Sequence, residues 1–151
     1  MISNHEIDAY VSKDPFISRI YGGTLAINEL PSLKQPHPRI FIVNTDPSYK
    51  PGTHWLAVYV HERSEHFDSA GQEPVLPRLD SFLLKQSPHK GYIYNSNRIQ
   101  STTSFTCGLF CLMYAYYRSR GVSYSSFLSM FTYSDLEQNE TVVKYFYRMT
   151  K

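Results

Sequence analysis

The most apolar segment of the chain, CGLFCLMYAYYR at 107–118, begins with a cysteine and carries a second cysteine four residues later. Polar residues precede it, so we expect a buried helix with Cys107 at its N-terminus and Cys111 one turn deeper. The positive end of the helix dipole favours a thiolate, which makes Cys107 a candidate nucleophile. Gly108, directly behind it, leaves room for a substrate backbone. The alternative for Cys107 is an inert core residue, because free cysteines are usually buried.

His54 is the candidate base for this thiol. It opens an expected buried strand at 54–60, directly after the turn Pro51-Gly52-Thr53. A strand end holds an imidazole on a rigid element while the ring reaches an open cleft, and Trp55 alternates to the other face. The alternative is a surface histidine at a strand edge, and the chain contains six histidines.

Two further polar residues complete a candidate site. Asp68 follows His54 by 14 residues at the end of the next expected strand, where antiparallel pairing would let its carboxylate orient the imidazole. A turn cap is the alternative for Asp68, since Ser69-Ala70-Gly71 follow it. Gln100 lies seven residues before Cys107, and its amide could form an oxyanion hole with the Cys107 N–H. The alternative for Gln100 is a solvated loop residue.

Short strands must position His54 and Asp68. RIFIVN at 39–44 and HWLAVYV at 54–60 predict two strands, the second buried on both faces, and EHFDS at 65–69 predicts a third. Tyr92–Tyr94 predicts one more. Residues 22–38 contain two adjacent glycines and three prolines, so we expect a loop there.

Helices are expected on both sides of these strands in the sequence. Capping boxes at Ser3–Glu6 and Ser134–Glu137 predict helix starts, and Asp14-Pro15 predicts the end of the first helix. Shorter helices are expected around 79–83 and 124–131, and Gly121 is placed to cap the 107–118 helix. The sum is an α+β fold, a small mixed or antiparallel sheet packed against helices, with a central buried helix starting at the nucleophile.

Length and composition limit the remaining choices. The 151 residues fit a single domain over 1–151 that needs no disulfide, metal or cofactor to fold. The 13 tyrosines and 9 phenylalanines are better explained by a core of large side chains than by an aromatic groove.

The net charge of +2 permits weak DNA or polyanion binding. No run spans a bilayer and no signal peptide opens the chain, so we expect action inside a cell and no membrane partner.

The order His, Asp, Gln, Cys resembles the adenovirus maturation protease family, which shares a clan with SUMO-deconjugating cysteine proteases. Cys-Gly-Leu-Phe-Cys, with a glutamine seven residues before it, is the most specific match. The other matching segments are Ile42–Thr45, Gly52–Trp55, Phe67–Ser69 and the Asp14-Pro15-Phe16…Tyr21 stretch. The resemblance runs from about Ser3 through the Cys107 helix and suggests a compact member of the family.

The resemblance implies His54 as base, Cys107 as nucleophile, Asp68 as orienting acid, Gln100 as oxyanion donor and Trp55 packed beside the site. Adenovirus enzymes usually carry Glu in place of Asp68, whereas SUMO proteases carry Asp. Adenovirus enzymes also bind an activating peptide through an upstream cysteine that has no counterpart here. Any peptide activator is therefore expected to act non-covalently.

Three functions remain open at this stage. The first is a thiol endopeptidase that cuts viral capsid and core precursors after glycine, at Gly-Gly or Gly-X-Gly sites, during virion maturation. Such an enzyme would act in the host cell, at the nucleus or viral assembly site, and in the virion. The second is a deconjugating protease for a ubiquitin-like protein. The third is an acetyltransferase or an inactive binding module on the same fold.

Overall fold

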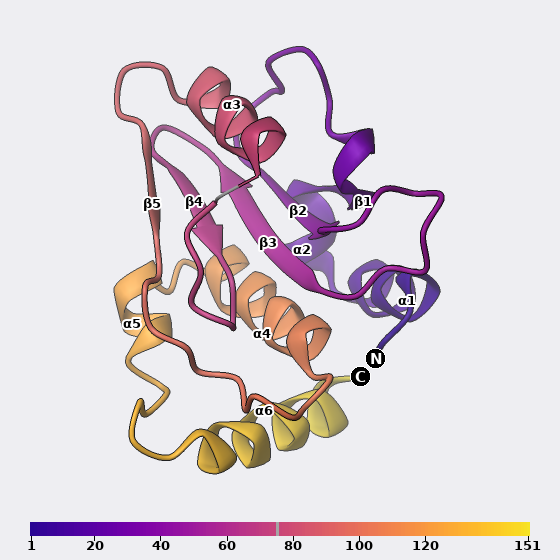
Figure 1. The fold of residues 1–151 in the computed structure, drawn as a ribbon, viewed down its shortest axis with the longest axis vertical. Coiled ribbons are helices and arrows are strands. Elements are labelled where there is room, and N and C mark those ends of the chain that lie inside the picture. Colours follow the sequence, from indigo (N-terminus) through magenta and orange to yellow (C-terminus); the bar gives the residue numbers. More distant parts are fainter. Residues whose placement is uncertain (75) are drawn as a thin grey trace.

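The computed structural model describes residues 1–74 and 76–151, and its centre is a five-stranded mixed sheet in the order β1-β2-β3-β4-β5 (Figure 1). The central three strands form an antiparallel meander, and the two outer strands pair in parallel with their neighbours. The strands are β1 (Tyr21–Ala26), β2 (Arg39–Asn44), β3 (Trp55–Val60), β4 (Ser64–Phe67) and β5 (Tyr92–Tyr94). The predicted mixed sheet is confirmed.

Alternating side chains of the strands build two separate cores, because both faces of the sheet are covered. Ile42 and Ala57 belong to the core on one face, while Val43 and Leu56 belong to the core on the other. The first face carries α1 (Asn4–Lys13), α2 (Pro15–Ile20), α4 (Cys107–Ser119), α5 (Tyr124–Leu128) and α6 (Leu136–Thr150). The second face carries α3 (Pro77–Gln86) and the short 3₁₀ helix η1 (Ile27–Glu29).

Helix α4 is the predicted central buried helix. It lies against β3 and also contacts α1, α2, α5 and α6. Its apolar residues on all sides explain this position, since a helix that is hydrophobic all round must be enclosed. Phe67 of β4 stacks on Tyr114 of α4 with ring centroids 5.1 Å apart, so large aromatic side chains do fill the core here, as expected. Arg120 caps the helix, and Gly121 follows with φ +85°, which a glycine adopts without strain.

The prediction of a loop over residues 22–38 was wrong at its start, because β1 occupies Tyr21–Ala26. Its sequence, YGGTLA, has little strand propensity, but pairing with the strongly apolar β2 outweighs that weakness. Gly22 is required there: a Cβ atom at this position would lie 2.3 Å from the Phe41 ring. A glycine that reads as a loop signal is thus a site of close packing within a strand.

The helix termini agree with the sequence except at the end of α4, where Arg120 and not Gly121 is the C-cap, and at the start of α6. Ser3 and Glu6 form the predicted capping box of α1. Asp14 ends that helix and also caps α2, a short helix that the sequence analysis did not predict. The predicted capping box at Ser134 was wrong: Asp135 is the N-cap of α6, and its side chain accepts a hydrogen bond from the Gln138 N–H at 3.1 Å.

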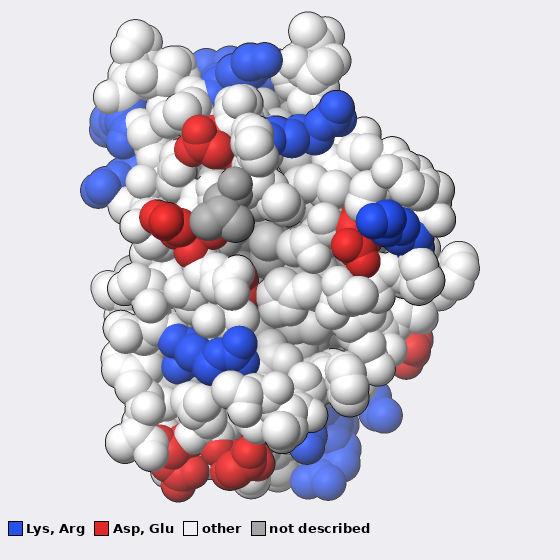
Figure 2. Space-filling view, in the orientation of Figure 1, with Lys and Arg blue, Asp and Glu red and all other residues white. Residues whose placement is uncertain are grey.

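The two ends of the described chain lie side by side (Figure 1). Tyr10 of α1 forms a 2.6 Å hydrogen bond with Thr150 of α6, so the first helix is linked to the last. None of the helices in residues 1–74 and 76–151 is long and apolar enough to cross a membrane. On the face seen in Figure 2, basic and acidic side chains are interspersed.

Candidate active site

Three elements bring the predicted site residues to one edge of the sheet. His54 directly precedes β3, and Asp68 directly follows β4; since these strands are antiparallel, both residues lie at the same edge. Helix α4 begins at that edge with Cys107, whose sulfur accepts a hydrogen bond from the Trp55 N–H at 3.4 Å. His54, Asp68 and Cys107 are therefore brought together although up to 53 positions of sequence separate them.

The turn before His54 depends on one glycine. Gly52 has φ +82°, and a Cβ atom there would lie 2.5 Å from the Asn44 side chain. After the turn, the His54 carbonyl accepts a hydrogen bond from the Thr45 N–H at 3.0 Å. The turn is thus hydrogen-bonded to the residue that follows β2, and this fixes the position of the His54 backbone.

Asp68 holds the imidazole. His54 Nε2 and Asp68 Oδ1 are 2.7 Å apart, and the same oxygen accepts a hydrogen bond from the Ala70 N–H at 2.8 Å. The turn cap and the orienting acid, which the sequence presented as alternatives, are combined in one carboxylate. Asn95 fixes the Asp68 backbone from both sides, accepting from its N–H at 2.9 Å and donating to its carbonyl at 2.6 Å.

This pairing sets the charge of the base. Burial disfavours the imidazolium, but the hydrogen bond to Asp68 and the interaction with Cys107 outweigh it and raise the pKa of His54 to about 10. The ring therefore keeps its proton at neutral pH. The imidazolium and the Cys107 sulfur line the same pocket.

His54, Gln100 and Cys107 line one pocket of about 200 Å³. The Gln100 side chain is fixed at both ends: its amide nitrogen donates to the Ser104 carbonyl at 3.1 Å, and its oxygen accepts from Ser69 Oγ at 2.5 Å. Because a carbonyl can only accept, the amide orientation is determined. One of the two amide hydrogens is used in this way, so the second can serve a substrate oxygen.

The loop that carries Gln100 is anchored by a residue that the sequence analysis missed. Glu140 of α6 is buried, and its carboxylate accepts hydrogen bonds from Ser101 N at 2.9 Å, Ser104 Oγ at 3.1 Å and Thr106 Oγ1 at 2.7 Å. A buried carboxylate is stable only when its oxygens are paired in this way. Glu140 thereby holds the loop that leads into Cys107.

Trp55 and Gly108 lie beside Cys107, but the space at Gly108 is already filled. A Cβ atom on Gly108 would lie 2.1 Å from Ile2 and 3.1 Å from the Trp55 ring. The Trp55 indole N–H donates to the Ile2 carbonyl at 3.0 Å, and Met1 Sδ is 3.8 Å from Cys107 Sγ. The expectation that Gly108 leaves room for a substrate backbone was therefore wrong: this glycine accommodates the N-terminal segment.

Cys111 is fully buried one turn below Cys107, and burial raises the pKa of its thiol well above the ordinary value. Both cysteines are free. Within residues 1–74 and 76–151, no cluster of three or more His, Cys, Asp or Glu side chains is arranged to hold a metal ion.

Comparisons with known proteins show similarity to viral proteases. No established family profile matches the chain. A cysteine protease of African swine fever virus is 33% identical over 99 residues, covering 58% of this chain and 36% of the relative. A protease of bovine adenovirus 4 is 30% identical over 101 residues, covering 56% and 50%. The matches thus span about a third to a half of the length of these relatives.

Solved structures show the same fold. The crystal structure of the African swine fever virus protease has a TM-score of 0.59 at 22% identity, covering 85% of this chain and 61% of that one. The SUMO protease Ulp1 has a TM-score of 0.51 at 14% identity, covering 85% and 73%. The central domain of a Legionella pneumophila protein, Lpg1148, has a TM-score of 0.54 at 15% identity, covering 99% and 96%. The predicted fold and the resemblance to viral cysteine proteases are confirmed.

Proposed function

We propose that this chain is a cysteine endopeptidase with Cys107 as nucleophile and His54 as base. The observation that carries the proposal is that His54, held by Asp68 at 2.7 Å, lines the same pocket as Cys107, a thiol at a helix N-terminus. The homologues named as a cysteine protease of African swine fever virus and a protease of bovine adenovirus 4 support it.

The geometry suits acyl transfer. Cys107 Sγ attacks the scissile carbonyl carbon, and the carbonyl electron pair moves onto oxygen, where the Cys107 N–H and the Gln100 amide stabilise the negative charge. The His54 imidazolium gives its proton to the leaving nitrogen as the C–N bond breaks, leaving a thioester. His54 then takes a proton from water, whose oxygen attacks the thioester and releases the acid and the thiolate.

For the substrate, we propose cleavage after glycine in viral capsid or core precursors during virion maturation. The hollow around Cys107 is about 200 Å³, smaller than the neighbouring hollows of about 340 and 520 Å³. Such a restricted space suits a residue without a side chain. Activity in the host cell and virion, a non-covalent peptide activator and weak polyanion binding are further parts of this proposal.

A second candidate function is removal of a ubiquitin-like protein. The family resemblance suggested by the sequence implies that such a protein also ends in glycine. The observation in its favour is the acid: Asp68, rather than Glu, orients His54. The two candidates share one chemistry and differ in the protein that occupies the site.

The test compares substrates on one enzyme preparation. We expect the purified chain to cleave peptides at Gly-Gly or Gly-X-Gly in preference to alanine-substituted peptides, and Cys107→Ala to cleave none of them. A ubiquitin-like precursor processed far faster than any peptide would support the second candidate. Absence of turnover on every substrate, with a candidate activator present, would reject the protease assignment in favour of a binding module or acetyltransferase.

A further inference from the structure

Phe105 is the one large apolar side chain that the described residues place in the wall of the Cys107 pocket. Apart from Ala70 and Cys107 itself, every other described residue of that wall carries a hydroxyl, carboxamide, imidazole or guanidinium group. Phe105 is 73% exposed, whereas seven of the nine phenylalanines are buried and the remaining one, Phe16, is 44% exposed. The most exposed phenylalanine of the chain therefore lies two residues before the proposed nucleophile.

Exposure by itself assigns Phe105 no role, because single apolar side chains are common on protein surfaces. What distinguishes this ring is the anchored loop that carries it. The Glu140 carboxylate accepts hydrogen bonds from Ser104 Oγ at 3.1 Å and Thr106 Oγ1 at 2.7 Å, so both neighbours of Phe105 are fixed. The Ser104 carbonyl also accepts from the Gln100 amide at 3.1 Å. An aromatic ring on such a loop needs little further ordering when a ligand covers it.

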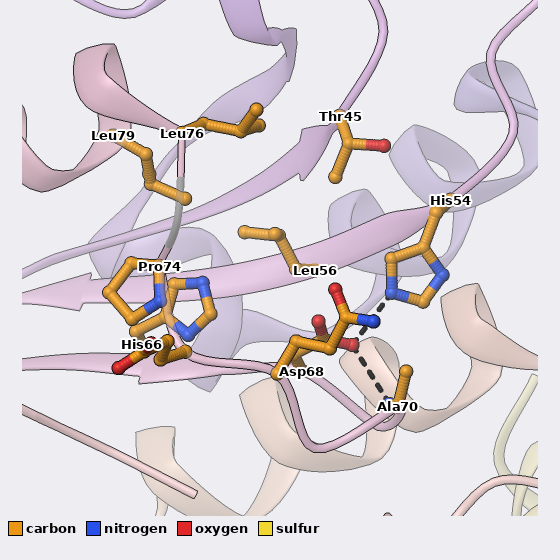
Figure 3. Close-up of a pocket in the computed structure, with 11 residues that line it drawn as sticks. Thr45, His54, Leu56, His66, Asp68, Ala70, Pro74, Leu76 and Leu79 are labelled. Atoms are coloured by element: carbon orange, nitrogen blue, oxygen red, sulfur yellow. Dashed lines mark hydrogen bonds and ion pairs between the residues drawn. The ribbon is translucent and has the colours of Figure 1, made fainter. Parts of the chain in front are cut away.

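The pocket that Phe105 lines adjoins a larger hollow of about 340 Å³, whose wall contains three leucines (Figure 3). His54 and Ala70 line both spaces, and Figure 3 shows the imidazole turned toward Asp68. Phe105 lines the Cys107 pocket and does not line the larger hollow. A peptide at Cys107 can therefore contact this ring without entering the larger hollow, so the two apolar surfaces would act on different substrate residues.

We propose that Phe105 determines specificity by packing its ring against an apolar side chain of the substrate close to the scissile bond. This inference rests on the proposed protease function. The contact removes apolar surface of both partners from water and requires no rearrangement of the anchored loop. A polar side chain in the same place would lose hydrogen bonds to water without gaining any from the ring. Phe105 takes no part in breaking the peptide bond, so the contact should act on substrate affinity.

The first test measures kcat and KM for peptides that carry leucine or asparagine, side chains of similar size, at each non-glycine position within three residues of the scissile bond. At one position, the wild type should prefer leucine by about tenfold in kcat/KM, mainly through KM. Phe105→Ala should bring that ratio close to one and leave kcat within about twofold of the wild type. Phe105→Leu should keep most of the preference, and Phe16→Ala, the same change at the other exposed phenylalanine, should keep all of it.

This comparison is not confounded by folding. Because the Phe105 ring is mostly exposed, Phe105→Ala should unfold in denaturant at the same concentration as the wild type. A leucine preference that is the same in the wild type and Phe105→Ala at every position overturns the inference. An equal loss of kcat on leucine and asparagine peptides also overturns it, since that result would assign the ring to the structure of the loop.

The second test does not require turnover. The same peptides are titrated into Cys107→Ala protein labelled with ¹³C-phenylalanine, and the Phe105 resonances are assigned by their absence from Phe105→Leu. At one position, the leucine peptide should shift these resonances and bind about tenfold more tightly than the asparagine peptide. Phe105→Ala should remove this difference.

The two measurements together separate this inference from the proposed function. Selective binding at Phe105 without cleavage of any peptide by the wild type would reject the protease function and keep the contact. Cleavage of the peptides, with equal binding of leucine and asparagine forms and unshifted Phe105 resonances, would keep the protease function and overturn the contact.

Discussion

At the scale of single residues, one carboxylate decides both the orientation and the charge of the base. Asp68 holds His54 at 2.7 Å, and its own backbone is fixed by Asn95. Burial lowers the pKa of His54, but this contact, together with the interaction with Cys107, raises it to about 10.

Asp68→Asn should therefore lower the pKa of His54 toward or below its ordinary value of 6.5. A neutral amide cannot offset the cost of burying an imidazolium. In an NMR titration, the wild-type His54 ring should remain protonated at pH 8, whereas the variant ring should be largely neutral there. The exposed His89 provides the internal control. A His54 ring that stays protonated at pH 8 in the variant would show that another group holds the charge.

The two cysteines should differ sharply in reactivity. Cys107→Ala should abolish turnover, a loss of several orders of magnitude, because Cys107 is the one thiol among the described residues that line the pocket with His54. Cys111→Ala should keep most of the activity, since that thiol is fully buried with a raised pKa. Mass spectrometry after brief iodoacetamide treatment should find the label on Cys107. Faster labelling of Cys111 would contradict the assignment.

Gln100→Ala should lower kcat by about 10²–10³ with little change in KM, as for the loss of one oxyanion donor. Since Gln100 also accepts a hydrogen bond from Ser69, Ser69→Ala is the matched control: it removes that bond and leaves the amide in place. Similar losses in both variants would assign Gln100 to loop structure alone.

At the scale of elements, α6 supports the site without contributing a reacting group. Its Glu140 gathers Ser101, Ser104 and Thr106, and its Asn139 donates to the Ile99 carbonyl at 3.0 Å. The loop from 99 to 106, which carries Gln100 into α4, is therefore held in place by a helix that follows it in the sequence. Steady positioning of such a loop is what an oxyanion hole requires.

Glu140→Gln should destabilise the fold by about 1–3 kcal/mol and lower kcat/KM by roughly tenfold. The amide has one accepting oxygen, and its NH₂ group would face donors that the carboxylate now satisfies. Denaturant unfolding and peptide kinetics measure the two effects. Glu137 is exposed one turn earlier on α6, and the same change there should alter neither the stability nor kcat/KM.

The elements also show what the sequence could and could not predict. Strongly periodic or uniformly apolar segments, such as 39–44 and 107–118, gave correct elements because their burial follows from their own composition. β1 was missed because its stability comes from its neighbour, not from its residues. His54, Asp68, Gln100 and Cys107 were accessible through their order and the resemblance. Glu140 was not, since its partner Thr106 lies 34 residues away.

At the scale of the whole molecule, the sheet separates two cores, and buried ionisable groups lie on both sides of it. On the α4 side, Glu65 pairs with Arg118, with Oε2 and Nη2 at 2.5 Å, and accepts from Tyr114 OH at 2.6 Å. Burial opposes the charged form, but these bonds and the one from His61 lower the pKa of Glu65. On the α3 side, His66 is buried in its neutral form. Folding stability must therefore depend on pH on the acidic side.

The sign is the same for both groups. A carboxyl group with a lowered folded-state pKa contributes stability above its unfolded pKa, and this is lost as the pH falls through the folded value. A histidine with a folded pKa of about 4 takes up a proton first in the unfolded chain, so acidification from 6.5 toward 4 favours unfolding. The pH dependence of stability due to Glu65 lies mainly below pH 4.5. Of these two groups, His66 therefore accounts for the dependence between pH 4.5 and 6.5.

His66→Leu should therefore make the protein more resistant to acid. At pH 5, the neutral burial of His66 should cost about 2 kcal/mol of unfolding free energy relative to pH 8, from the difference between pKa values of about 4 and 6.5. His54, whose pKa is raised to about 10, gains stability over the same interval in all three proteins, so the informative quantity is the difference between them. Between pH 8 and pH 5, the change in unfolding free energy should be less favourable by about 2 kcal/mol in the wild type and in His89→Leu than in His66→Leu. Equal changes in all three proteins would mean that His66 is not buried uncharged.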